Sequence, residues 1–272
     1  LAREILELHT LGARTVYDQN DVTEFARALT GFTVGGMSKG PVQRLMAQNG
    51  KDGDSQFFAA IHEPGDRLVI GRRYIQKGEA QARAILSDIA THPATAKHIA
   101  TKIAQHFAAD VPPSSLVARL EKSFLESGGD LPKFYRTLIE SPEMWLAKQA
   151  KFKSPWDWVI SSLRALNVRE LPNNRQGANM LAQMGQPVWK PGSPAGFSDM
   201  TENWAGGAAL MRRVEIASRI AERSANRVDA RTLAPRILST QLSTMTAESI
   251  ARAESPSQGL ALFLLSPEFL RR

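Results

Sequence analysis

The chain has 272 residues, of which 43% are hydrophobic and 22% charged, which is the composition of a folded globular protein and excludes intrinsic disorder. It contains no cysteine, so disulfides, thiolate zinc sites and a cysteine nucleophile are excluded for these residues. Lys and Arg number 34 against 27 Asp and Glu, which gives a formal net charge of +7.

The first residues have the pattern of a helix that has already begun. Leu1, Ile5 and Leu8 follow the i, i+4, i+7 spacing of an apolar helix face. We therefore expect the sequence to be truncated at its N-terminus, within a longer domain. The helix should end before Gly12, a residue type that favours the left-handed conformation after a helix.

A second helix is predicted to begin at Asp21 and to end at Gly31. Asp21 would be its N-cap, and Glu24, three residues later, would complete a capping box. The stretch 33–73 loses the helical period. Within it, residues 57–62 and 67–70 are predicted to form a small β-hairpin across the turn 63–66, an insertion at about 55–72.

The rest of the chain is predicted to be helical, apart from one long loop. The loop covers about 184–207, with three prolines and five glycines, and loops of that length are usually functional or disordered. We expect a mostly α-helical fold, a multi-helix bundle-like single domain over 1–272 with the small β-hairpin. Further helices are predicted at about 78–90, 93–107, 115–126 and 131–140.

Six strings in order along the chain resemble one family, the bacterial DUF1800 proteins of unknown function, in the later part of the family domain. The strings are LAREILELHTLG (1–12), DVTEFARALTG (21–31), PATAKHIATK (93–102), KFKSP (151–155), MGQP (184–187) and SPEFLRR (266–272).

The resemblance implies a largely helical fold and an exported, periplasmic bacterial protein, often encoded beside a sulfatase-like partner family. It implies no established reaction and no catalytic residues. The family's usual His-Asp pair appears here as His62-Glu63, which puts any role of a short aspartate there in doubt.

His9, Asp21, Glu24 and His62 form the sharpest candidate set for a catalytic or metal site. Imidazole and carboxylate groups ligate zinc and other divalent metals and serve as general acids and bases. Their spacing matches no metal motif. A structural role is favoured, with Asp21 and Glu24 as helix caps. His92, His98 and His106 are interpreted as residues on a solvated helix face.

All five tryptophans lie between residues 145 and 204. Aromatic faces beside polar groups are typical of sites for sugars or peptides, although tryptophans also anchor long loops onto helices. The candidate ligand-binding residues in and after the long loop are Trp189, Lys190, Phe197, Asn203 and Trp204.

Arginines recur along the predicted helix after Trp204 and end the chain at Arg271 and Arg272, which indicates a positive face. An anionic cell-surface polymer or an acidic partner protein would match it. Nucleic acid is disfavoured, because no nucleic-acid-binding motif is present and Arg213, Arg219 and Arg223 alternate with Glu and Ala in an amphipathic pattern.

Three function hypotheses follow from these patterns. The favoured one is an envelope accessory or binding protein that engages a polymer or a partner through the Trp-rich loop and the basic face. The alternative is a metal-assisted hydrolase using His9, Asp21, Glu24 and His62, and the third is nucleic-acid binding. Whether the chain is an enzyme is left open.

Overall fold

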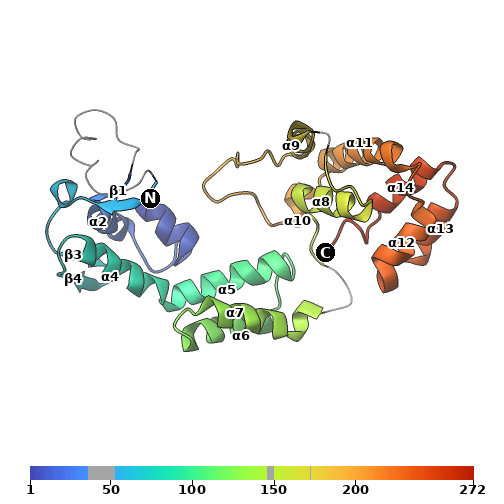
Figure 1. Cartoon of the computed structure of the whole chain (residues 1–272). Helices are drawn as coiled ribbons and strands as arrows, with labels where there is room; N and C mark the ends of the chain where they lie inside the picture. Colours follow the sequence, from blue (N-terminus) through green and yellow to red (C-terminus); the bar gives the residue numbers. More distant parts are fainter. Residues whose placement is uncertain (36–52, 146–149, 172) are drawn as a thin grey trace. The chain divides into compact units, whose positions relative to one another are not determined.

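The structure is a computed structural model that describes residues 1–35, 53–145, 150–171 and 173–272 (Figure 1). Its contacts divide the chain into two compact units: unit 1 contains residues 1–102 and 114–139, and unit 2 contains residues 103–113 and 140–272. A single domain over the whole chain stays a prediction. The middle of the stretch expected to be irregular, 36–52, lies outside the described residues.

The predicted fold class is confirmed, because helices dominate both units and the described strands are short. The helical elements up to residue 140 are α1 (Ala2–Glu4), η1 (Ile5–His9), α2 (Gln19–Leu29), η2 (Ala59–Ile61), α4 (Glu79–Ala90), α5 (Pro93–Phe107), α6 (Ser114–Glu126) and α7 (Leu131–Glu140). Those that follow are η3 (Pro142–Trp145), α8 (Pro155–Ala165), α9 (Asn174–Gln183), α10 (Thr201–Trp204), α11 (Gly207–Ser224), α12 (Ala230–Leu238), η4 (Ser239–Gln241), α13 (Thr244–Ala251) and α14 (Pro256–Leu264).

The small β-hairpin exists, but its strands differ from the predicted pair. β3 (Arg67–Val69) pairs antiparallel with β4 (Arg72–Tyr74), while β2 (Ser55–Phe57) pairs with β1 (Phe32–Val34). The turn of the hairpin is Ile70-Gly71, with φ of 50° and 70°, and not residues 63–66. Two positive φ values in sequence are what a tight two-residue hairpin loop needs, and isoleucine at the first position gives no sequence signal for it.

Helix α2 begins three residues earlier than predicted, because Asp18 and not Asp21 is its N-cap. Asp18 accepts a hydrogen bond from the backbone N–H of Asp21, and Asp21 accepts one from the N–H of Asp18, both at 2.9 Å. The capping box is therefore Asp18–Asp21, and Glu24 is free to take part in other contacts.

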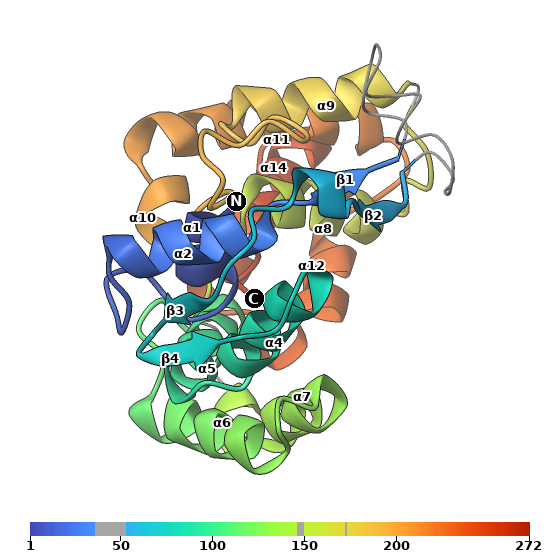
Figure 2. The same ribbon diagram turned by 90° about the vertical axis from the view of Figure 1, so that its left-hand side faces the viewer.

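The core of unit 1 forms where α2, α4 and the β3–β4 hairpin pack together (Figure 2). Phe25 and Ile85 are fully buried there, and Val69 and Tyr74 contribute one buried side chain from each hairpin strand. The hairpin is thus fixed to α2 and α4 by apolar burial, the largest favourable contribution to folding.

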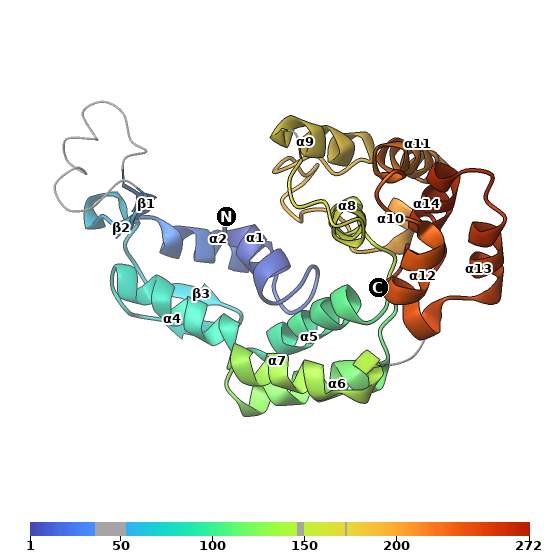
Figure 3. The same cartoon turned by 45° about the vertical axis from the view of Figure 1, so that its right-hand side comes forward.

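The core of unit 2 is built by α11 and α14, with α12 and α13 packed against α14 (Figure 3). Helix α8 adds Trp158, which is fully buried and donates its indole N–H to the carbonyl of Leu264 at 2.9 Å. Helices α8 and α14 each begin with a serine N-cap followed by proline, at Ser154 and Ser255, as the Ser-Pro pattern favours.

The long loop connects α9 with α11 and contains one short helix, α10. Otherwise residues 184–200 have no regular structure. Within the residues that the structure describes, no helix is long and apolar enough to cross a membrane.

Candidate functional site

The four candidate metal or catalytic residues all lie in unit 1, and three of them have structural partners. Asp21, besides capping α2, accepts a hydrogen bond from the N–H of Ile70 in the hairpin turn at 2.7 Å. His62 donates from Nδ1 to the carbonyl of Thr30 at 2.8 Å. His9 is exposed at the end of the π-helical turn η1.

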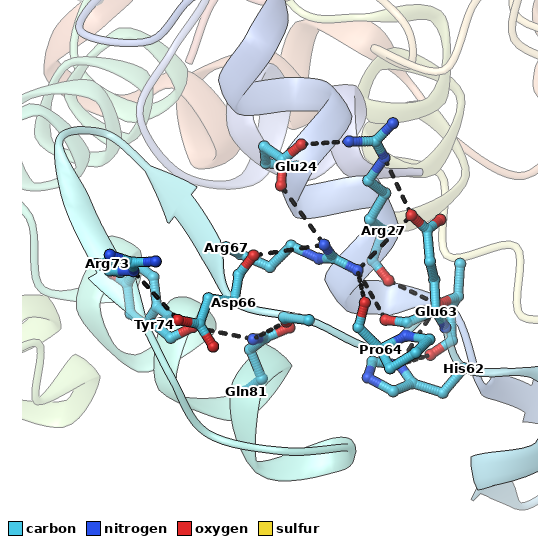
Figure 4. A network of polar contacts seen from close by, with 12 residues as sticks. Glu24, Arg27, His62, Glu63, Pro64, Asp66, Arg67, Arg73, Tyr74 and Gln81 are labelled. Atoms are coloured by element: carbon cyan, nitrogen blue, oxygen red, sulfur yellow. Dashed lines mark hydrogen bonds and ion pairs between the residues drawn. The ribbon is translucent and has the colours of Figure 1, made fainter.

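Glu24 belongs to an ion-pair network around Arg67, which Figure 4 shows. Its carboxylate lies 2.5 Å from the Arg27 guanidinium and 3.8 Å from that of Arg67. Arg67 is buried and also donates to the carbonyl oxygens of Glu63 and Pro64, at 2.7 and 3.1 Å. This network joins the turn before β3 to helix α2, so Glu24 is accounted for by a structural role.

The geometry therefore does not bring these candidates together as ligands. Over residues 1–35, 53–145, 150–171 and 173–272, no group of three or more His, Asp or Glu side chains is arranged to hold a metal ion. Each of Asp21, Glu24 and His62 instead joins α2 or the residue after it to the segment 62–70.

A different group of polar side chains gathers in unit 2, at the end of the long loop. His106, near the end of α5, donates from Nδ1 to the carboxylate of Asp199 at 2.8 Å. A carboxylate on Nδ1 fixes the orientation of an imidazole ring and leaves its Nε2 available to a ligand. His106 thus has a defined carboxylate partner, which its interpretation as a residue on a solvated helix face did not include.

Lys151 also holds this end of the loop. Lys151 is only 1% exposed; its ammonium lies 2.7 Å from the carboxylate of Asp110 and also donates to the carbonyl of Asp199. Asp110 accepts a further bond from the N–H of Thr201 at 2.8 Å. Burial alone would raise the pKa of Asp110, but the hydrogen bonds from Lys151 and Thr201 lower it overall, so this carboxylate stays ionised.

His106, Lys151 and Asp199 border a polar cavity of about 210 Å³ in unit 2. Its walls include His106, Asp199 and Arg272, and the Arg272 guanidinium lies 3.6 Å from Asp157 and donates to the carbonyl of His106 at 3.3 Å. Gln186, from the start of the loop, adds an amide. The cavity therefore presents hydrogen-bond donors and acceptors of both charge signs.

A second, apolar cavity of about 360 Å³ shares Trp156, Gln186 and Phe197 with the polar one. Leu181 of α9 also lines it, together with Pro187, Val188, Trp189 and Pro191 of the loop. Trp189 is 96% exposed and has a φ of 55°. A non-glycine residue in this conformation is strained by about 1–3 kcal/mol, and such strain gathers at functional sites. We call the two cavities together the loop pockets.

The other predicted ligand-binding residues have separate positions. Trp204 is buried, lines the polar cavity and donates its indole N–H to the carbonyl of Ser198 at 2.8 Å. It packs against Phe197, with ring centroids 6.3 Å apart. Lys190 and Asn203 are exposed and line neither cavity. The Trp-rich loop thus combines two anchoring aromatics with one exposed aromatic.

The arginines of α11 do not all face solvent. Arg213 is 1% exposed and lies over the rings of Phe152 and Trp158, at 4.7 and 5.7 Å from their centroids. Burial lowers the pKa of its guanidinium to about 10. Arg219 and Arg223 instead line a groove of about 410 Å³ between α9 and α11, together with Arg175.

The comparisons with known proteins identify the chain at the family level. The family model described as "Protein of unknown function (DUF1800)" matches residues 1–271. The chain belongs to the DUF1800 family. No curated protein and no solved structure shows a significant match.

For this DUF1800 chain, the sequence indicated Trp189, Phe197 and Trp204 through the clustering of tryptophans, but not His106 or Lys151. His106 lies 93 positions from its partner Asp199, and no local pattern links them. Lys151 stands in a short string without helical period, so its burial had no signal in the sequence.

Proposed function

We propose that this DUF1800 protein is a binding protein that engages an extended polymer of saccharide type through the loop pockets. The observation that carries the proposal is the pairing of exposed aromatic rings with a polar cavity: Trp156 is 52% and Trp189 96% exposed, and Trp156 borders both cavities. Sugar rings stack their apolar faces on such rings while their hydroxyls form hydrogen bonds.

The polar cavity supplies those hydrogen bonds. The His106–Asp199 pair, the amide of Gln186 and the guanidinium of Arg272 together offer donors and acceptors within one cavity. Hydroxyl groups both donate and accept, so a mixed lining of this kind suits them better than a lining of one charge sign.

Rigid anchoring supports a binding role for the loop. Lys151 and His106 hold its end at Asp199, while Gln186 accepts a hydrogen bond from the N–H of Trp156 at 2.8 Å near its start. A pocket that is already formed binds without the free-energy cost of ordering a mobile segment.

We propose that the groove between α9 and α11 is the basic part of the binding surface. Its lining contains Arg175, Arg219 and Arg223, several Asn and Gln side chains, and no carboxylate among the described side chains. Acidic groups of a polymer could form ion pairs with these guanidinium groups, because arginine forms bidentate hydrogen bonds with oxyanions such as carboxylate.

The proposal places the protein in the bacterial envelope as an exported, periplasmic accessory protein, with an anionic cell-surface polymer as ligand or a sulfatase-like protein as partner. This placement is supported by the resemblance described above. The apolar cavity of the loop pockets is compatible with such a ligand, because envelope glycans expose pyranose rings.

Calorimetric titration of the full chain with hexasaccharides of glucose and of N-acetylglucosamine tests the proposal. We expect binding by the unmodified protein and a roughly 10-fold loss of affinity in Trp189→Ala and in Trp156→Ala, in line with the loss of one aromatic contact.

Trp145→Ala is the matched control, because Trp145 is also exposed, belongs to unit 2 and lines neither cavity. Its affinity should equal that of the unmodified protein. Equal losses in all three variants, or no binding of either saccharide, would refute a saccharide site in the loop pockets.

A further inference from the structure

A third cavity in unit 2, separate from the loop pockets, has a composition that the polymer-binding proposal does not use. It has a volume of about 510 Å³ and lies between the end of α8, the end of α12 with η4, and the C-terminal residues. Its cationic lining residues are Lys153, Arg164 and Arg271, and hydroxyl groups come from Ser161, Ser239 and Thr240. We call it the basic cavity.

Lys153 is a largely buried cation that lacks a carboxylate partner. Its ammonium donates to the carbonyl of Phe269 at 2.7 Å and lies 4.2 Å from the centroid of the Phe269 ring, and within the described part of the chain it forms no ion pair. The nearby Asp157 is already engaged by Arg272. A buried charge without a counter-ion is costly, and an anionic ligand would compensate it.

The one carboxylate of the basic cavity, Glu268, offsets at most one of the three cationic charges. Glu268 accepts hydrogen bonds from the hydroxyl of Thr246 at 2.9 and 3.1 Å and from the N–H of Ser243 at 3.2 Å. Burial would raise its pKa, but these hydrogen bonds lower it overall. The Glu268 carboxylate is therefore ionised and hydrogen-bonded to the first turn of α13.

The backbone of the cavity wall is strained at Ser239, which has a φ of 48° directly after α12. Serine rarely adopts this conformation, and at this position its hydroxyl belongs to the cavity lining. Strained positions of this kind persist where the surrounding structure enforces them, and they gather at ligand sites.

The walls of the basic cavity also include apolar side chains. Ile237, Leu238 and Phe269 stand beside the cations and hydroxyls. A cavity of this volume is in the range that holds a small molecule, whereas an isolated inorganic anion would leave the apolar walls without contact.

We propose that the basic cavity binds a small organic anion in which a phosphate or sulfate ester is attached to an apolar or aromatic group. Lys153, Arg164 and Arg271 hold the oxyanion, the hydroxyls of Ser239 and Thr240 donate to its oxygens, and the apolar walls receive the organic part. This site is independent of the loop pockets, since the two share no lining residue.

Calorimetric titration of the full chain with phenyl phosphate, phenyl sulfate, inorganic phosphate and phenol tests the assignment. Phenyl phosphate or phenyl sulfate should bind at least 10-fold more tightly than inorganic phosphate and phenol. Lys153→Met and Arg164→Gln should each weaken that binding about 10-fold, the effect of losing one charge-assisted hydrogen bond.

Arg169→Gln is the control, because it removes an exposed arginine of the same unit outside the cavity. It should change the affinity less than 2-fold. Lys153→Met removes a charge that has no carboxylate partner, so it should fold, and Arg164→Gln alters an exposed residue. Trp156→Ala and Trp189→Ala should leave phenyl phosphate binding unchanged, which separates this site from the saccharide site.

Phenol binding as tight as that of phenyl phosphate would overturn the assignment. So would an equal loss in Arg169→Gln, which would show a dependence on net charge alone, or the absence of binding by both phenyl esters at millimolar concentration. The relative affinities of phenyl phosphate and phenyl sulfate then identify the preferred ester.

Discussion

The two units bury arginine in different ways. In unit 1, Arg67 is buried between the carboxylates of Glu24 and Glu63, each 3.8 Å away. In unit 2, Arg213 is buried against the rings of Phe152 and Trp158, donates to one backbone carbonyl, and forms no ion pair within the described residues. Unit 1 therefore balances its buried charge internally, whereas unit 2 holds unbalanced positive charge close to its cavities.

This difference is the reason why we propose ligand sites in unit 2. In the Arg67 network, which Figure 4 shows, the guanidinium of Arg67 lies within ion-pair distance of the carboxylates of Glu24 and Glu63. In unit 2, Lys153, Arg164 and Arg271 line a cavity that contains a single carboxylate, Glu268, so positive charge is in excess there. Positive charge that a fold leaves uncompensated can pair with an anionic ligand, and this supports the proposed sites in unit 2.

The largest effect is expected at Lys151, the buried cation of unit 2 that does have a carboxylate partner. Lys151→Met should lower the free energy of unfolding of unit 2 by about 3 kcal/mol, because it leaves Asp110 partly buried without its partner. Urea denaturation followed by circular dichroism measures the change.

The double variant Lys151→Met, Asp110→Asn is its control, since removing both charges should restore part of the lost stability. Equal stability of Lys151→Met and the unmodified protein would show that the pair does not hold the loop end in solution.

The arginine comparison is tested by two matched substitutions. Arg67→Met should lower the free energy of unfolding by about 2 kcal/mol, because it leaves carboxylates and two carbonyl groups of unit 1 without their donor. Arg213→Met should change stability by less than about 1 kcal/mol, since methionine keeps the packing on the aromatic rings and leaves no carboxylate unpaired. Urea denaturation of both variants gives the difference, and a larger cost for Arg213→Met would reverse the comparison.

Lys153 should give unit 2 a pH dependence. Burial lowers the pKa of its ammonium to about 8, whereas an unfolded lysine titrates near 10.4. Between these values the unfolded state binds more protons, so the free energy of unfolding should rise with pH, by roughly 2 kcal/mol between pH 8 and 10. Denaturation midpoints across this range measure it, and Lys153→Met should remove the rise.

A rise of the same size in Lys153→Met would assign the pH dependence to another group. Below about pH 7 the lysine is charged in both states, so it should contribute no slope there.

The smallest effect on stability is expected at Trp189. Its side chain is 96% exposed, so Trp189→Ala should change the free energy of unfolding by less than about 0.5 kcal/mol. Thermal unfolding measures this value. A loss above about 1 kcal/mol would show that Trp189 anchors the loop, as Phe197 and Trp204 do.

Local patterns predicted the helices well, because apolar spacing and caps are local signals. They missed the position of the hairpin turn, since residues 63–66 have the composition of a turn while Ile70 does not. The N-cap was placed at Asp21 instead of Asp18 because both aspartates are followed, three residues later, by an acidic residue that can complete a capping box.

Of the residues in the proposed site, sequence patterns indicated only the aromatic ones. Clustering of tryptophans indicated the loop, but the partners of His106 and Lys151 lie 93 and 41 positions away in sequence. Arg213 has the same amphipathic context as Arg219, and only packing against Phe152 and Trp158 shows that it is buried. Such contacts depend on tertiary structure, which periodicity does not contain.

The most direct test of a binding function in unit 2 is the affinity of the unmodified chain, Trp189→Ala and Trp145→Ala for a hexasaccharide, measured by calorimetry at one salt concentration. The account predicts measurable binding, a roughly 10-fold loss in Trp189→Ala and no change in Trp145→Ala. Identical affinities of the three proteins, or no binding at all, would contradict it.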